Sequence, residues 1–215
     1  MGEVKKVFSE IYRNNSWGSR ESASGAGSQL NRTHHLRQEL PGMLHELNIR
    51  SLLDIPCGDF NWMQHVNLGD IQYIGADIVP ELIERNRELY SSSIRRFEHL
   101  DLTSAPLPKV DAIFCRDCLG HLAYADIVSA LNNICSSGAL FLLTTHFSFR
   151  TISANEEIKS GWWRRLNFEL APFHWPPPQR YIIEGCDEGG GKYADKSLSV
   201  WPIGQVRSRI PNHVA

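Results

Sequence analysis

Apolar residues recur at helical spacing at the start of the chain, and this pattern then stops abruptly. Residues 4–12 place their apolar side chains on one face of a helix, so they predict a short amphipathic helix. Residues 16–28 read SWGSRESASGAGS and have too few apolar positions to pack as a regular element. We interpret this segment either as a linker or as a lid, because Trp17, Arg20 and Glu21 are unusual residues for a spacer.

Downstream, the pattern predicts helices and then an alternation of strands and helices. Residues 29–48 return to helical spacing, and Pro41 predicts the start of a second helix within them. The apolar runs that follow are SLLDI, YIGADI, FEHLDL, DAIFC and ALFLLTTHF, and the helical stretches among them are PELIERNRELY and YADIVSALNNIC. This order is typical of a mostly parallel α/β sheet with helices on both faces.

The last third of the chain differs from the rest. Beyond Phe149 the chain is rich in Trp and Pro, and proline excludes a regular central strand there. The runs RYIIE and SLSVWPI flank a Gly-rich loop and predict an antiparallel pair that closes the sheet. We expect one domain over residues 1–215. Its parts are N-terminal helices and a lid in 1–48, a cofactor-binding core in 49–148, and a substrate-recognition insert with the closing strands in 149–215.

Charge and composition limit the partners of the protein. With 22 Lys and Arg against 24 Asp and Glu, the net charge of -2 gives no general attraction to nucleic acid or to an anionic membrane. The first residues lack the apolar core of a secretion signal, and no apolar run approaches the roughly 18 residues of a membrane span. Five scattered cysteines suit reduced thiols better than a disulfide framework. We therefore expect a soluble, cytoplasmic protein.

Acidic residues stand at the ends of three successive predicted strands. Asp54 ends the first strand, Asp77 the second and Asp101 the third. Open α/β sheets bind ligands at the carboxyl ends of their strands, and a carboxylate there can accept both hydroxyls of a ribose. The spacing therefore predicts a nucleoside pocket.

The turn after the first strand favours one nucleoside ligand over another. A dinucleotide needs G-x-G-x-x-G to admit its pyrophosphate, whereas this turn has Gly58 followed by Asp59, whose charge would repel it. Asp54 and Asp59 would instead attract a cation, such as the ammonium and sulfonium groups of S-adenosylmethionine (SAM). The charge pattern thus favours SAM over NAD.

The segments DIPCGD and GADI resemble the first glycine motif and the acidic second strand end of class I SAM-dependent methyltransferases, over residues 50–145. The resemblance implies a Rossmann-like, seven-stranded sheet whose last strand is antiparallel. It also implies that Gly58 lies beside the methionine part of SAM, Asp77 on the ribose, and Asp101 with Leu102 beside the adenine. We expect the cofactor to be bound by Trp17, Asp54, Cys57, Gly58, Asp59, Asp77, Ile78, Asp101, Leu102 and Arg116.

This resemblance has one departure and one extension. Pro56 and Cys57 stand where the common glycine motif has glycine, which weakens the motif taken alone. The segments WGSRES, RDCLGHL and GWWRRLNFELAPF also resemble a bacterial methyltransferase-like family associated by name with sugar or surface-polysaccharide proteins. This second resemblance covers nearly the full chain and identifies no acceptor.

Two residues after the fourth predicted strand are candidate catalytic groups, because class I enzymes place groups there that face the transferred methyl. Methyl transfer is an in-line displacement at a sulfonium, so the protein must align the acceptor and remove its proton. Either Asp117 or His121 could be that base. The alternative is that Asp117 caps a helix or pairs with Arg116, and that His121 only packs.

Cysteine and histidine spacing does not indicate a metal site. Cys115 and Cys118 form a CxxC pair, but no second pair completes a tetrahedral site. His34 and His35 are adjacent, and adjacent residues point in different directions on a helix. We predict no metal.

The aromatic and basic residues of 162–175 suit an acceptor site. Aromatic faces can stack on sugars and arginines such as Arg164 and Arg165 can bind an acid, although the aromatics could equally cover the core. We predict SAM-dependent O- or N-methylation of a small, sugar-like or acidic metabolite. The alternatives are a non-catalytic SAM-binding or regulatory module and an NAD-dependent oxidoreductase or epimerase. Nucleic acid and membrane are not expected partners, and the sequence assigns no oligomeric state.

Overall fold

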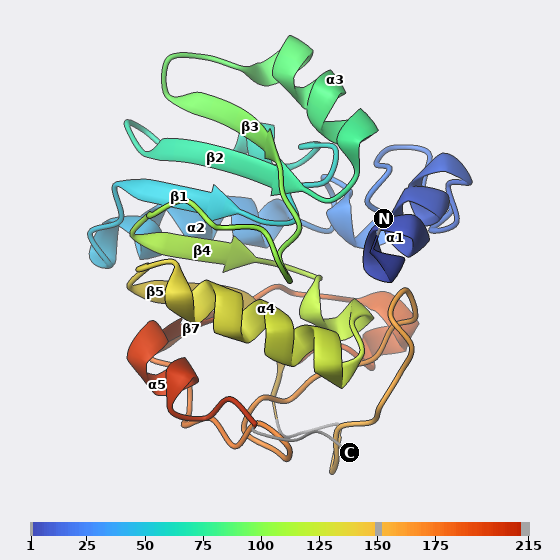
Figure 1. The fold of residues 1–215 in the computed structure, drawn as a ribbon, viewed down its shortest axis with the longest axis vertical. Coiled ribbons are helices and arrows are strands. Elements are labelled where there is room, and N and C mark those ends of the chain that lie inside the picture. Colours follow the sequence, from blue (N-terminus) through green and yellow to red (C-terminus); the bar gives the residue numbers. More distant parts are fainter. Residues whose placement is uncertain (1, 149–151, 212–215) are drawn as a thin grey trace.

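The computed structural model describes residues 2–148 and 152–211, and a seven-stranded sheet forms its centre (Figure 1). The strands lie in the order β3-β2-β1-β4-β5-β7-β6. Their bounds are Ser51–Asp54 (β1), Gln72–Asp77 (β2), Arg95–His99 (β3), Ala112–Cys115 (β4), Phe141–Phe147 (β5), Arg180–Ile183 (β6) and Lys196–Pro202 (β7). Strands β1 to β5 are parallel, and β7 is antiparallel to both of its neighbours. The predicted Rossmann-like sheet is confirmed.

Helices cover both faces of the sheet. One face packs against α2 (His34–Glu46) and α3 (Pro80–Tyr90), and the other packs against α4 (Tyr124–Ser136) and α5 (Ile203–Arg207). Figure 1 shows α4 in front of the sheet, and α1 (Glu3–Arg13) beside the ends toward which β1, β2 and β4 point. The predicted N-terminal helix is thus confirmed. No helix within the described ranges is long and apolar enough to cross a membrane.

Strand β4 shows why the central strands read as continuous apolar runs. Ala112 and Phe114 face the α2 side, whereas Ile113 and Cys115 face the α4 side. All four residues are buried. A parallel strand between two helical layers has no solvent-facing positions, so it shows no alternation of apolar and polar residues.

Residues 34–46 form one helix, so the prediction that Pro41 starts a second helix was wrong. Pro41 lies inside α2. An interior proline removes a backbone hydrogen bond and costs about 3 kcal/mol. Leu36, Leu40 and Leu44 recur every four residues and are completely buried, and each contributes about 1.5 to 3 kcal/mol by burial. The shared apolar face therefore outweighs the proline.

The segment between β5 and β6 supplies part of the core. Phe168, Phe173 and Trp175 are buried and pack around Trp201 of β7. These three aromatic residues therefore belong to the core, which was the alternative to a role in the acceptor site. Residues 149–151, where the predicted Trp- and Pro-rich part begins, lie outside the described residues. The predicted antiparallel pairing of the last two strands is confirmed.

The topology creates a crevice between β1 and β4. The chain leaves β1 toward β2 on one side, and leaves β4 toward β5 on the other, and ligands bind outside the carboxyl ends at such a switch point. Asp54 and Asp77 are the last residues of β1 and β2. Strand β3 already ends at His99, so Asp101 lies two residues beyond the strand end at which it was expected.

Candidate active site

A cavity of about 540 Å³ lies at the carboxyl ends of the strands. The ten residues expected to bind the cofactor and the two candidate catalytic residues all line it. Helix α1 and residues 23–28 contribute further walls. A volume of this size accommodates a small-molecule ligand.

The order of the strands fixes the order of chemical groups along the cavity. Strands β2 and β3 lie on one side of β1, and Asp77 with residues 100–103 lines this part, which we call the β2 end. Strands β4, β5 and β7 lie on the other side, and Asp117, Phe147 and Lys196 line that part, which we call the β7 end. The cavity therefore joins two chemically different regions.

Two buried carboxyl groups stand beside the turn after β1. Burial raises the pKa of Asp54 from 3.8 to about 8, although the Tyr73 hydroxyl donates to its carboxyl oxygen at 2.5 Å. Burial also raises the pKa of Asp77, to about 6, against the effect of backbone N–H groups of Val79 and Gly58 that donate to it. Desolvation dominates both shifts because each side chain is 5% exposed or less.

The Gly58 backbone is held from two sides. Its N–H donates to Asp77 at 3.1 Å, and its carbonyl oxygen accepts from the Asn86 side chain at 2.7 Å. Gly58 has a φ of +55°, and a Cβ at this position would lie 2.0 Å from the Ser24 hydroxyl. Only glycine therefore fits the turn.

Residues 22–28 belong to the segment 16–28 that is predicted as a linker or a lid, and we call them the lid. They are fixed to the cavity at two points. The Asp59 carboxylate accepts hydrogen bonds from the Ser22 hydroxyl at 2.9 Å and from the Ala23 N–H at 2.7 Å. The Gly27 carbonyl oxygen accepts a hydrogen bond from Arg116 at 3.0 Å. Asp59, which is expected to contact the cofactor, lines the cavity and also holds the lid through its carboxylate oxygens.

The remaining expected cofactor residues of the β2 end lie side by side at the cavity wall. Ile78 follows Asp77, and Leu102 is buried beside the half-buried Asp101. The Thr103 N–H and hydroxyl both donate to one oxygen of Asp101, at 2.8 and 2.6 Å. This leaves the other carboxyl oxygen of Asp101 for a ligand.

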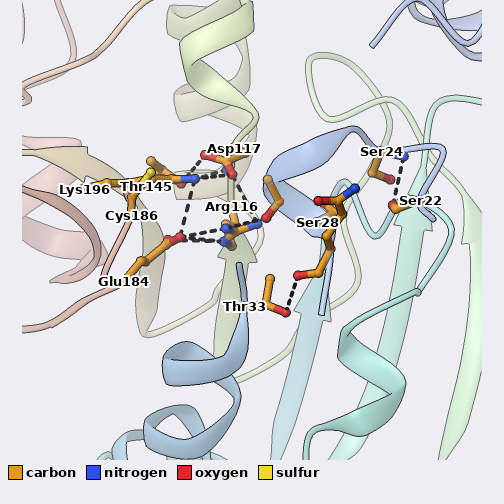
Figure 2. A network of polar contacts seen from close by, with 12 residues as sticks. Ser22, Ser24, Ser28, Thr33, Arg116, Asp117, Thr145, Glu184, Cys186 and Lys196 are labelled. Atoms are coloured by element: carbon orange, nitrogen blue, oxygen red, sulfur yellow. Dashed lines mark hydrogen bonds and ion pairs between the residues drawn. The ribbon is translucent and has the colours of Figure 1, made fainter. Parts of the chain in front are cut away.

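Arg116 lies at the centre of a buried charge network (Figure 2). Its guanidinium contacts Glu184 at 2.7 Å and Asp117 at 3.1 Å, and it also reaches the Gly27 carbonyl. Lys196 pairs with Asp117 at 2.6 Å and with Glu184 at 3.4 Å. Two cations and two carboxylates thus neutralise one another, and the network connects the lid to the last strands of the sheet.

These contacts bear on which candidate can act as a base. Burial alone would raise the pKa of Asp117, but Arg116 and Lys196 together hold it well below its usual range. The Asp117 backbone has a φ of +48°, and its N–H donates to the Thr145 hydroxyl. A carboxylate so strongly stabilised in its charged form is a weak proton acceptor. The alternative in which Asp117 pairs with Arg116 is therefore what the structure contains.

His121 is better placed to accept a proton. Its Nδ1 lies 2.9 Å from the Trp162 carbonyl oxygen, which can only accept, so Nδ1 carries the hydrogen and Nε2 is an acceptor. Burial lowers the pKa of His121 below 6.5, which keeps the ring neutral near pH 7. Trp17 packs against this ring at 5.4 Å, so Trp17 lies beside the candidate base.

The aromatic residues of 162–175 divide into three groups. Trp163 lines the cavity, Trp162 is 70% exposed, and the others named above belong to the core. Arg164 lies over the Tyr124 ring and donates to a backbone carbonyl, and neither it nor Arg165 lines the cavity. Arg164 is thus directed away from the cavity, whereas Arg165 lies over the ring of Tyr193, which lines it.

The comparison with known proteins bears directly on this site. Residues 52–137 match a family model described as a methyltransferase domain. This part of the chain is a methyltransferase domain. The match contains Asp54, Gly58, Asp77 and His121, and with the fold it confirms the predicted class I methyltransferase. No curated protein matches the chain.

Solved methyltransferases share the fold at low sequence identity. N-methyltransferase NodS from Bradyrhizobium japonicum, in complex with S-adenosylhomocysteine (SAH), is 14% identical over 90% of this chain and 96% of its own, with a TM-score of 0.61. Human N-acetylserotonin methyltransferase, in complex with SAM, is 12% identical over 93% of this chain, with a TM-score of 0.59. The present chain spans 59% of the length of that human protein.

Sequence reasoning missed several residues of the methyltransferase cavity. Lys196 begins β7 and lines the cavity, and Glu184, which follows β6, pairs with it behind the cavity wall; neither residue belongs to a local motif. Phe147 and Tyr193 add aromatic walls. The signal that could have indicated Lys196 is a single lysine at the start of an otherwise buried strand.

Proposed function

We propose that the chain transfers the methyl group of SAM to an oxygen or nitrogen atom of a small-molecule acceptor. The observation that carries this proposal is the single cavity in which the acidic ends of β1 and β2 are continuous with His121. Both NodS and the human methyltransferase are described as complexes with SAM or SAH, which supports the choice of donor.

The charges at the cavity fit SAM. Among the described residues, six carboxylate side chains and two cationic side chains line the cavity, and both cations are already paired with carboxylates. SAM carries a sulfonium and an ammonium group, so the unpaired carboxylates favour it over a ligand with a pyrophosphate. The same excess of carboxylates over cations argues against NAD, because they would repel its pyrophosphate.

Each part of SAM has candidate partners in this chain. Asp77 would accept the ribose hydroxyls, and Ile78, Asp101 and Leu102 would border the adenine. Cys57, Gly58 and Asp54 would surround the methionine part, while Trp17 and Arg116 would close the cavity beside the lid.

The residues of the β7 end would perform the transfer. Bound SAM supplies an electrophilic methyl group on its sulfonium. His121 would take a proton from the acceptor through Nε2, and the walls of the cavity would align the acceptor for in-line attack. The lid would exclude water from this space.

The shared sheet and cavity support a single domain, and the free cysteines support a location in the cytoplasm. Strands from residues 49–148 and 149–215 share one sheet, and residues of 1–48 line the same cavity. This supports the division into a lid region, a cofactor-binding core and a substrate-recognition part with closing strands. All five cysteines are free thiols, as a reducing compartment requires.

Calorimetric titration with SAM, SAH and NAD tests the proposal without knowledge of the acceptor. We expect micromolar binding of SAM and SAH and no binding of NAD. Asp77→Ala should weaken SAM binding by about 1.5 to 3 kcal/mol, because a charge-assisted hydrogen bond is lost, and Asp70→Ala at an exposed site is the control. Binding of NAD instead, or equal SAM affinity in wild type and Asp77→Ala, would reject the cofactor assignment.

A further inference from the structure

The β7 end of the cavity contains a cluster of aromatic rings. Phe147, Trp163 and Tyr193 all line the cavity and contact one another edge to face, at centroid distances of 5.3 to 6.3 Å. Their interplanar angles of 76° to 84° place the rings as the faces of a corner. A corner of this kind offers apolar ring faces and edges to a ligand.

A second aromatic group lines the same cavity through His121. Trp17 packs on the His121 ring at 5.4 Å and on Phe8 of α1 at 6.3 Å. The backbone beside His121 also adjoins the first group, because a Cβ at Gly120 would lie 3.9 Å from the Trp163 ring. The candidate base therefore stands between two aromatic groups.

The charged side chains that line this end of the cavity are nearly all paired, and two further cations, Arg165 and Lys192, lie over the Tyr193 ring without lining the cavity. Lys196 and Arg116 are neutralised by Asp117 and Glu184, and His121 Nδ1 is bonded to a backbone carbonyl. Glu188 lines the cavity without a cationic partner among the described residues. This end thus has one unpaired carboxylate and no unpaired cation among the charged residues that line it.

We infer that the acceptor is an uncharged aromatic molecule that carries its reacting O–H or N–H group on the ring. This inference rests on the proposed function and specifies its acceptor. A flat ring can fill the space between the two aromatic groups with both of its faces. A sugar carries several hydroxyl groups, and few free hydrogen-bond partners remain for them in this part of the cavity. Their desolvation would therefore be uncompensated.

An acidic acceptor is disfavoured for a separate reason. A ligand carboxylate would be repelled by Glu188, and neither of the cations that line the cavity among the described residues is free to compensate it. Lys196 can serve only if it leaves two carboxylates, Asp117 and Glu184, which are themselves buried or half-buried. Breaking such a buried pair is strongly unfavourable.

The step balances without any further reactant. The acceptor O–H proton passes to Nε2 of His121, and an oxygen lone pair forms the new bond to the methyl carbon. The carbon–sulfur bond breaks, and its electron pair returns to sulfur. The products are the methyl ether, SAH and a protonated His121, which then releases its proton to water.

Calorimetric titration with three probes tests the acceptor class. The probes are 2-naphthol, 6-hydroxy-2-naphthoate and methyl β-D-glucopyranoside, each titrated with and without saturating SAH. We expect 2-naphthol to bind, the naphthoate to bind about tenfold more weakly, and the glycoside to give no heat of binding. Glu188→Gln should reduce the difference between the two naphthalene probes without changing the affinity for 2-naphthol.

A matched pair of variants locates the binding. Tyr193→Leu should weaken 2-naphthol binding about tenfold, whereas Tyr181→Leu on the exposed side of β6 should not change it. No 2-naphthol binding, equal or tighter binding of the naphthoate or the glycoside, or an unchanged affinity in Tyr193→Leu would overturn the inference. Failure of SAH to bind would instead reject the proposed function, and the titrations without SAH still judge the acceptor class.

Discussion

Asp54 should make the folded protein less stable as the pH rises from 5 to 8. Its side chain is 3% exposed, and burial raises its pKa from 3.8 to about 8. Between these two values the folded protein keeps a proton that the unfolded chain has lost. The free energy of unfolding therefore decreases with rising pH across this window, and the stabilisation from the proton is complete only below about pH 4.

The size of the effect follows from the two pKa values. Integrated from pH 5 to pH 8, the raised pKa of Asp54 lowers the free energy of unfolding by an amount on the order of 4 kcal/mol. The smaller rise at Asp77, to about 6, contributes a further decrease on the order of 1 kcal/mol. Asp54→Asn should remove the larger part, because the amide does not titrate and its oxygen can still accept the Tyr73 hydroxyl.

Urea unfolding at pH 5, 6, 7 and 8 measures this directly. The wild type should lose several kcal/mol more than Asp54→Asn over this range, and Asp70→Asn, at an exposed position, should follow the wild type. The comparison cancels the titration of every other group that the variants share. If the wild type and Asp54→Asn lost the same free energy of unfolding, the reasoning from burial to a raised pKa would be refuted.

Two further predictions concern the base and the lid. His121→Ala should keep its affinity for SAM but transfer methyl at least about 10²-fold more slowly, and the wild-type rate should rise with pH through a pKa below 6.5 and then level off; an unchanged rate would exclude His121 as the base. Asp59→Asn should weaken the hydrogen bonds to Ser22 and Ala23 and speed limited proteolysis of residues 16–28, whereas SAH should slow that cleavage in the wild type. Equal cleavage in all three cases would show that residues 22–28 are not a lid.

The fold and the β2 end of the site could be predicted from the sequence because their signals are local. Asp54 and Asp77 each end a buried apolar run, and the run itself fixes where the strand lies. Such local signals fail where tertiary packing determines where a helix or strand begins and ends. Pro41 continues a helix because three buried leucines hold it, and Asp101 lies past its strand because β3 ends early.

The charge network of the β7 end could not be predicted, because its contacts join distant parts of the chain. Arg116 and Glu184 are 68 residues apart, and Asp117 and Lys196 are 79 apart. The hydrogen bonds from the lid to Asp59 were missed for the same reason, because Ser22 and Ala23 lie 37 and 36 residues away from it in the sequence.

The buried acids connect stability with the proposed function. Near neutral pH Asp54 is mostly protonated, whereas Asp77 is mostly ionised although burial disfavours its charge, so both are poor choices for stability alone. A cationic ligand would offset the cost of ionising these buried acids, because it would stabilise the charged form and lower the pKa of both groups. Binding of SAM at neutral pH should then release protons, and the energy of the cation–carboxylate contacts is partly used to ionise the acids. Under the proposed function, the two acids whose burial lowers stability as the pH rises would therefore be the residues that select a positively charged ligand.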